Sequence, residues 1–136
     1  MARIMIIDDE KIVGDIAKLS LEQEGHEVET FVNSVLALDR IRDLEFDVVV
    51  TDLKMKGKDG FEVLRVVKGL YPGTKVIMIT AFANLDVAIE AIRGGVHDFF
   101  PKPFKMKELK ESIKRALDGQ PPLKPGGLKP GEFSSF

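Results

Sequence analysis

Three consecutive valines, Val48–Val50, constrain the fold of this chain more than any other stretch. β-Branched residues favour strands, and a continuous apolar run predicts a strand that is covered on both faces. The strand is expected to end at Thr51 and Asp52, because the following segment is polar and contains Gly57 and Gly60, which indicate a turn. Asp52 is therefore predicted at the carboxyl end of a buried strand, where ligands bind in open parallel sheets.

Short apolar or alternating runs of this kind recur along the chain. Four further strands are predicted at Ile4–Ile7, Glu27–Phe31, Val76–Ile79 and Val96–Phe100. Each predicted strand is followed by apolar residues at helical spacing, such as Ile12, Ile16 and Leu19 after the first one. Strands that alternate with helices predict an α/β fold, a doubly wound (βα)5 parallel sheet with right-handed crossovers and helices on both faces.

Cap and breaker residues separate the predicted elements. Asn33 or Ser34 is expected to begin the second helix and Asn84 the fourth, because a short polar side chain can accept hydrogen bonds from the free N–H groups of a first turn. Gly25 suits the end of the first helix, and Pro72 stops the third.

Composition excludes several functional classes. The 136 residues suffice for one domain with one core, and a formal net charge of −2 gives no general attraction to nucleic acid. The absence of cysteine excludes disulfides and thiolate metal sites. No apolar run exceeds four residues, so neither a membrane span nor a signal peptide is predicted, and a cytoplasmic location is expected.

Residues 119–136 form a segment of different composition, with four prolines, four glycines and no helical or strand period. Such a segment cannot bury enough apolar surface to offset the entropy of ordering it. We expect a domain at 1–118 and a linker at 119–136. Two interpretations of Gly131–Phe136 stay open, a native linker that leads to an output domain or a remnant of cloning.

The polar residues of greatest interest follow different predicted strands and are expected to meet at one edge of the sheet. They are Asp8 and Asp9, Asp52, Thr80 and Lys102. Clustered carboxylates repel one another unless a cation lies between them, and oxygen ligands without histidine or cysteine favour Mg²⁺. A carboxylate nucleophile, a hydroxyl donor and a lysine suit phosphoryl transfer, with an acyl phosphate as the product.

The order and approximate spacing of these residues resemble the receiver domain of bacterial two-component response regulators. The motifs that carry the resemblance are Asp8-Asp9, Asp52, Thr80-Ala81 and Lys102-Pro103-Phe104, and the resemblance covers Ala2 to about Asp118. It implies a flavodoxin-like three-layer fold with strand order 2-1-3-4-5. It also implies that Asp52 accepts a phosphoryl group from a sensor histidine kinase.

The resemblance implies further roles for individual residues. Asp8, Asp9 and Asp52 would hold Mg²⁺ together with the backbone carbonyl of Lys54. Thr80 and Lys102 would contact the phosphoryl group, and the peptide bond between Lys102 and Pro103 would be cis.

Phe99 matches the aromatic switch position of the family. If Thr80 moves to bond the phosphoryl group, it vacates space into which Phe99 can rotate. The predicted interaction face therefore comprises Leu85–Arg93, the fifth strand and the last helix, and a homodimer is its expected use.

The stretches that begin at Thr80, Gly94 and Phe100 look most like receivers of nitrogen-regulatory, enhancer-binding transcription activators. One departure from the family pattern is Lys56, where proline is common. Without proline the loop after Asp52 is expected to be less restrained.

Two other classes compete with this interpretation. A Mg²⁺-dependent phosphatase of the haloacid dehalogenase type also has an aspartate nucleophile at a strand end, but it requires a second aspartate at the position of Lys54. A flavodoxin-like cofactor binder would need a phosphate loop after the first strand, where Asp8, Asp9 and Glu10 would repel phosphate. His26 and His97 are expected to lie far from the site.

Overall fold

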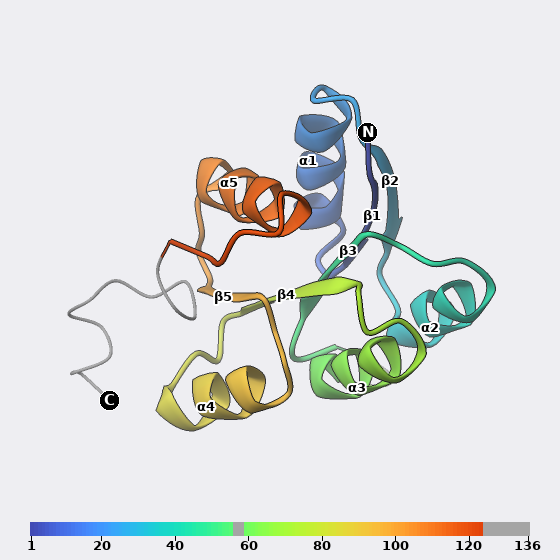
Figure 1. Cartoon of the computed structure of the whole chain (residues 1–136). Coiled ribbons are helices and arrows are strands. Elements are labelled where there is room, and N and C mark those ends of the chain that lie inside the picture. Colours follow the sequence, from blue (N-terminus) through green and yellow to red (C-terminus); the bar gives the residue numbers. More distant parts are fainter. Residues whose placement is uncertain (56–58, 124–136) are drawn as a thin grey trace.

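The computed structural model describes residues 1–55 and 59–123 (Figure 1). Lys56 and the segment Gly131–Phe136, both singled out above, lie outside the described residues. Strands and helices alternate along the chain in the order β1 Arg3–Ile7, α1 Lys11–Glu22, β2 Glu27–Phe31, α2 Ser34–Asp43, β3 Val48–Asp52, α3 Gly60–Leu70, β4 Lys75–Thr80, α4 Leu85–Arg93, β5 Asp98–Pro101 and α5 Met106–Leu117.

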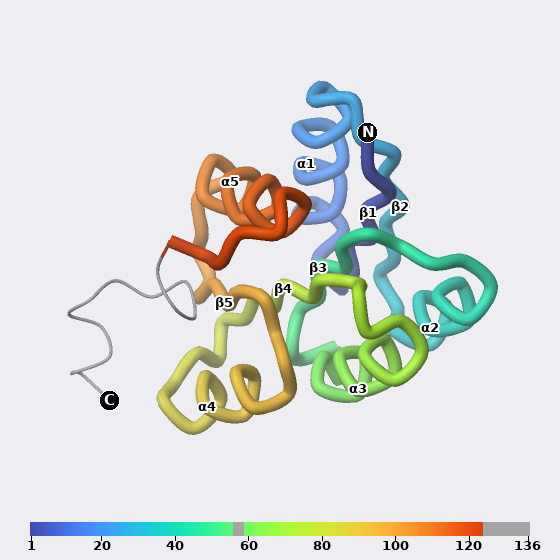
Figure 2. Tube along the Cα trace, in the orientation of Figure 1, coloured from blue at the N-terminus to red at the C-terminus, as the bar shows by residue number. Residues whose placement is uncertain are grey.

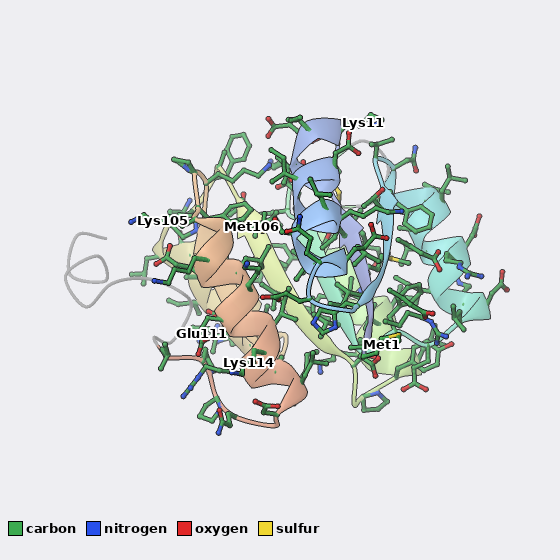
Figure 3. All side chains as sticks on the ribbon, turned by 90° about the horizontal axis from the view of Figure 1, so that it is seen from above. Met1, Lys11, Lys105, Met106, Glu111 and Lys114 are labelled. Atoms are coloured by element: carbon green, nitrogen blue, oxygen red, sulfur yellow. The ribbon has the colours of Figure 1, made fainter. Side chains whose placement is uncertain are left out.

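The five strands form one parallel sheet in the order β2-β1-β3-β4-β5, which confirms the predicted doubly wound topology. Helices α1 and α5 cover one face of the sheet, and α2, α3 and α4 cover the other (Figures 1 and 2). In the view from above, α1 and α5 lie over the same face of the sheet (Figure 3). β1 and β3 are neighbours in the sheet, so Asp8, which follows β1, and Asp52, which ends β3, lie at adjacent strand ends.

The core consists of two layers because successive strand residues point to opposite faces. Val49, Met78 and Phe99 pack with α2, α3 and α4, whereas Val50, Ile79 and Phe100 pack with α1 and α5. All five residues of β3 are buried, which confirms that the valine run lies in a strand covered on both sides. β2 lies at a sheet edge, as its alternating sequence predicts.

Helix α1 is present where it was predicted, but its buried face is not the one that its large apolar residues suggest. Ile12, Ile16 and Leu19 are 63%, 49% and 63% exposed. The residues that face the sheet are Gly14, Ala17 and Leu21. A Cβ on Gly14 would meet the Thr30 side chain at 3.5 Å, so small residues on this face allow α1 to lie close to β2.

The fifth strand begins at Asp98, two residues later than predicted. Gly95 has a positive φ of 89°, and the N–H of Val96 donates to the carbonyl of Ala91 at 3.1 Å. Val96 therefore belongs to the turn that ends α4, a common arrangement after a helix.

The start of α3 presses directly on the end of β3. The N–H of Gly60 donates to the carbonyl of Leu53 at 2.8 Å. A Cβ on Gly60 would lie 2.5 Å from the carbonyl oxygen of Asp52 and 2.9 Å from the Cα of Leu53. Only glycine fits between these backbone atoms, so this contact fixes the backbone that carries Asp52.

We expect Gly60→Ala to lower the free energy of unfolding by about 1–3 kcal/mol, because the new methyl group must displace backbone atoms. Gly69 provides a matched control in the same helix, since a Cβ there would meet no atom of the described residues within 4 Å. Gly69→Ala should raise the free energy of unfolding by about 0.5–1 kcal/mol. Urea denaturation of both variants tests this, and equal midpoints would contradict the close contact at Gly60.

Candidate functional site

An acidic cluster lies at the carboxyl edge of the sheet. Carboxylate oxygens of Asp8, Glu10 and Asp52 all lie within 4.8 Å of one another. Asp52 ends β3, Asp8 directly follows the adjacent β1, and Glu10 is the residue that precedes α1. The N–H of Glu10 donates to Asp8 Oδ1 at 2.9 Å, a local turn that helps to hold the backbone between β1 and α1.

Lys102 reaches into the centre of this cluster from the chain after β5. Its Nζ donates to Asp52 Oδ2 at 2.8 Å and to Glu10 Oε1 at 2.9 Å, and it lies 2.9 Å from Asp8 Oδ2. The Lys102 side chain is only 12% exposed, and its peptide bond to Pro103 is cis. One ammonium group therefore serves as counterion to three carboxylates.

Burial and this ion network shift the pKa values in the site. Burial raises the pKa of Asp8 above its ordinary value of 3.8, and the nearby Lys102 only partly opposes this. Burial alone would lower the pKa of Lys102, but its short contacts with the carboxylates of Asp52, Glu10 and Asp8 outweigh burial and raise that pKa above its usual value. Lys102 is therefore charged at neutral pH.

The charge of the cluster fits a divalent cation. With all four groups ionised, three carboxylates and one ammonium sum to −2. Asp8 Oδ2 is buried and has no hydrogen-bond partner among residues 1–55 and 59–123, although it lies 2.9 Å from Lys102 Nζ. Carboxylate oxygens with unused lone pairs are the ligands that Mg²⁺ prefers.

Thr80 lies on β4, which is paired with β3, and Phe99 lies on β5, the next strand out in the sheet. Thr80 ends β4, is fully buried, and its Oγ1 accepts a hydrogen bond from the N–H of Phe82 at 2.9 Å. Its carbonyl accepts the N–H of Lys102 at 2.8 Å, which ties the end of β4 to the lysine. Phe99 of β5 is also fully buried, in the layer of α2, α3 and α4.

One predicted metal-binding carboxylate lies apart from the cluster. Asp9 is exposed, and its carboxylate is not among the three that lie together. The role predicted for Lys54 concerns its backbone carbonyl and stays a prediction; its side chain is exposed, with Nζ 5.5 Å from the centre of the Phe82 ring.

Glu10 is the member of the cluster that was not predicted from the sequence. The signal for it is the acidic run that it shares with Asp8 and Asp9. The turn between β1 and α1 directs alternate members of that run, Asp8 and Glu10, toward Lys102.

An open groove of about 520 Å³ leads to the cluster. Its walls come from the first turns of α1 and from the chain between Lys102 and α5, and they include Val13, Ile16, Phe104 and Met106. The groove gives a reactant access to Lys102 along the exposed apolar side of α1. His26 and His97 precede β2 and β5 and lie at the opposite end of the sheet, as expected.

A doubly wound five-stranded sheet with an acidic cluster and a lysine at its carboxyl edge defines the class of CheY-like α/β proteins. Residues 4–114 match the family model of the response regulator receiver domain. The chain belongs to this family, whose members accept phosphoryl groups in two-component signalling. The family assignment does not support the alternative of a haloacid dehalogenase-type phosphatase.

Individual relatives agree with the predicted subfamily. The chain is 36% identical to the regulatory protein AtoC of Escherichia coli over 118 residues, which covers 87% of this chain and 26% of AtoC. It is 31% identical to the DNA-binding transcriptional regulator NtrC of Escherichia coli, covering 84% of this chain and 24% of NtrC. The beryllofluoride-activated NtrC4 receiver domain dimer matches with a TM-score of 0.83 and 32% identity, covering 88% of this chain and 98% of that one.

The chain thus spans about a quarter of the length of the curated relatives it matches. Within residues 1–55 and 59–123, no helix is long and apolar enough to cross a membrane.

Proposed function

We propose that this chain is a phosphorylation switch in which Asp52 accepts a phosphoryl group from a sensor histidine kinase. The observation that carries this proposal is the short contact between Asp52 Oδ2 and Lys102 Nζ, 2.8 Å, inside an acidic cluster whose two aspartates are buried. Asp52 is 5% exposed at the end of the central, buried strand β3, and the groove beside Lys102 gives a donor access.

In the proposed reaction, a carboxylate oxygen of Asp52 forms a bond to phosphorus while the phosphorus–nitrogen bond of the donor phosphohistidine breaks. The electron pair leaves with the imidazole, and the product is an acyl phosphate. The Lys102 ammonium offsets charge on the phosphoryl oxygens, and the Thr80 hydroxyl donates to one of them. Attack of water on phosphorus later regenerates Asp52, so the chain catalyses only its own phosphorylation and dephosphorylation.

Asp8 and Asp52 are proposed to hold Mg²⁺, with Asp9 and the backbone carbonyl of Lys54 as the further ligands that the family resemblance implies. Bound Mg²⁺ would neutralise negative charge on the transferred phosphoryl group. Glu10 competes with Asp9 for this assignment, because its carboxylate already lies with those of Asp8 and Asp52.

Two variants decide between Asp9 and Glu10. Asp9→Ala is expected to lower Mg²⁺-dependent labelling by acetyl phosphate by more than about tenfold, because a metal ligand is lost. Glu10→Gln should retain most of the labelling, since the amide oxygen can still accept from Lys102. Labelling rates as a function of Mg²⁺ concentration measure both effects. The reverse result would assign the ligand to Glu10, and normal labelling without Mg²⁺ would contradict a metal site altogether.

We propose that Thr80 and Phe99 transmit phosphorylation to the surface formed by α4, β5 and α5. Thr80 is tied to Lys102 through its carbonyl, and Phe99 lies one strand away in the same parallel ladder, opposite Met78. Movement of the Thr80 hydroxyl toward the phosphoryl group would vacate space for the Phe99 ring. The relative NtrC4 forms a dimer in its beryllofluoride-activated receiver, which supports a homodimer as the output.

Beryllofluoride, an inert phosphoryl analogue, is expected to raise the dimer fraction in sedimentation. Phe99→Ala should abolish this rise and leave acetyl phosphate labelling intact. Because Phe99 is fully buried and its truncation costs about 3–5 kcal/mol, Phe99→Leu serves as a second variant that keeps most of the core volume. If beryllofluoride changes neither association nor the amide shifts of residues 85–104, this surface is not the output.

The receiver is proposed to comprise residues 1–118 and to connect through residues 119–136 to an output domain that regulates transcription. The length of the relatives supports this, because the chain matches only about a quarter of AtoC and NtrC. Direct contact of this domain with nucleic acid is not proposed, and the cytoplasmic location stays a prediction.

A further inference from the structure

We propose that residues 120–123 form a strap across the surface of β5 and α5 in the resting protein, and that the strap competes with self-association through this surface. The competition rests on the proposed function, because it concerns the face assigned above to the dimer. The position of the strap is independent of that assignment.

The chain reverses direction immediately after α5. Gly119 has a positive φ of 72°, and its N–H donates to the carbonyl of Ala116 at 3.2 Å. The N–H of Gln120 donates to the carbonyl of Arg115 at 2.8 Å. This pair of hydrogen bonds with a left-handed glycine ends the helix and turns the chain back. In Figures 1 and 2 the red segment after α5 runs back beneath that helix toward β5.

Arg115 holds the returning chain against α5. Its Nε donates to the carbonyl of Pro121 at 2.9 Å. Pro121 and Pro122 each fix their own φ, so the segment that reaches Leu123 is stiff. The strap is therefore bound by a side chain of α5 and does not extend along the helix axis.

The strap borders a groove of about 360 Å³ between β5 and α5. The inner wall contains Asp98 and Phe100 of β5 and Ser112 of α5, and Leu123 contributes to the outer side. At the bottom of the groove β5 and α5 are joined by a hydrogen bond, in which Ser112 Oγ donates to Asp98 Oδ2 at 2.7 Å, and both residues are buried. β5 is an edge strand, and an uncovered edge is a site where another chain can add.

The strap is seated only in part. Leu123 is 66% exposed, and the hydrogen bond from Arg115 lies at the surface. Such a contact has a small net strength, so a larger surface can displace it. A second copy that approaches β5 and α5 meets the strap first. The strap would then reduce association about fivefold, the factor that corresponds to one ordinary hydrogen bond.

The absence of cysteine from the chain allows a single nitroxide label to locate the strap. The label is placed on Cys introduced by Lys107→Cys, an exposed position of α5 that borders the groove. We expect it to broaden the methyl signals of Leu123 in the resting full chain. Arg115→Gln, which removes the hydrogen bond to Pro121, should restore those signals. Lys114→Gln removes the same charge from an exposed neighbour on α5 (Figure 3) and should leave them broadened.

Sedimentation of the beryllofluoride-loaded protein without the label tests the competition. Arg115→Gln and Leu123→Ser are expected to strengthen association about fivefold, and Lys114→Gln is expected to leave it unchanged. Absence of broadening at Leu123 in the unaltered strap would overturn the proposal, and so would unchanged or weaker association in both variants. A third outcome is that neither the wild type nor any variant associates, while the broadening of Leu123 follows the expected pattern. The proposed dimer, and the competition of the strap with it, would then be wrong, but the placement of the strap would stand.

Discussion

Asp52→Asn is expected to reduce acetyl phosphate labelling to below about a thousandth of the wild-type level, because the amide lacks the nucleophilic oxygen that forms the acyl phosphate. Asn has nearly the same shape as Asp, so the variant should fold and β3 should stay buried on both faces of the sheet. Borohydride trapping followed by peptide mass mapping should place the wild-type label on Asp52 alone.

Asp59→Asn is the matched control for this substitution. Asp59 lies close in sequence and caps α3, where its Oδ1 accepts from the N–H of Glu62 at 3.0 Å. Asparagine caps helices about as well as aspartate, so stability and labelling should both be preserved. A label on Asp8, Asp9 or Asp59, or normal labelling of Asp52→Asn, would contradict the assignment of the phosphoacceptor.

Lys102→Met is expected to lower the free energy of unfolding at neutral pH by about 3 kcal/mol, because Asp8 and Asp52 lose their buried counterion. The side chains of these two aspartates are 0% and 7% exposed, so water can replace the ammonium only poorly. Asp8→Asn in the same chain should recover much of the loss by removing one of the unpaired charges. Lys107→Met, at an exposed position of α5, should have little effect.

The loss in Lys102→Met should depend on pH in a defined direction. In the folded protein the pKa of Asp8 is already raised above its ordinary value of 3.8, so the folded state binds the proton of this carboxyl group more tightly than the unfolded state does. The free energy of unfolding therefore falls as the pH rises from 3.8 through the folded pKa of Asp8. Without Lys102 the pKa of Asp8 in the folded protein rises further, so the pH range over which stability falls becomes wider. Because the pKa of Lys102 is raised in the folded protein, the stability that its ammonium group contributes is fully present at any pH below 10.5. Denaturation should therefore show a larger deficit at neutral pH than near pH 4, and a deficit that is constant with pH would contradict the ion network.

Much of the fold could be predicted because its signals are local. The valine run of β3 indicates a strand covered on both faces, and the caps at Asn33 and Asn84 form as predicted, with Asn84 Oδ1 accepting from the N–H of Val87 at 2.9 Å. The start of β5 could not be predicted in the same way. Val96 is apolar and β-branched, but the hydrogen bond to Ala91 assigns it to the helix end.

The site, like the fold, could be predicted from the sequence only where the signal is local. Asp8, Asp52 and Lys102 could be selected because each follows a strand, and the parallel sheet brings strand ends together. Which side chains of the run Asp8–Glu10 turn inward depends on the backbone between β1 and α1, and the spacing of residues does not report it. The exposed apolar face of α1 is a similar case, because Ile12 and Ile16 have the same helical period whether they face the sheet or the solvent.

The neighbouring rings of Phe99 and Phe100 connect β5 to both layers of the core. Phe99 is embedded in the layer of α2, α3 and α4, and Phe100 is embedded in the layer of α1 and α5, where it also borders the groove beside Leu123. β5 has four residues and, within the described part of the chain, pairs with β4 alone. Because one short strand carries both rings, we expect a displacement of Phe99 in its layer to move Phe100 in the other. A substitution that changes the packing on one face of β5 should therefore also alter the packing on the opposite face.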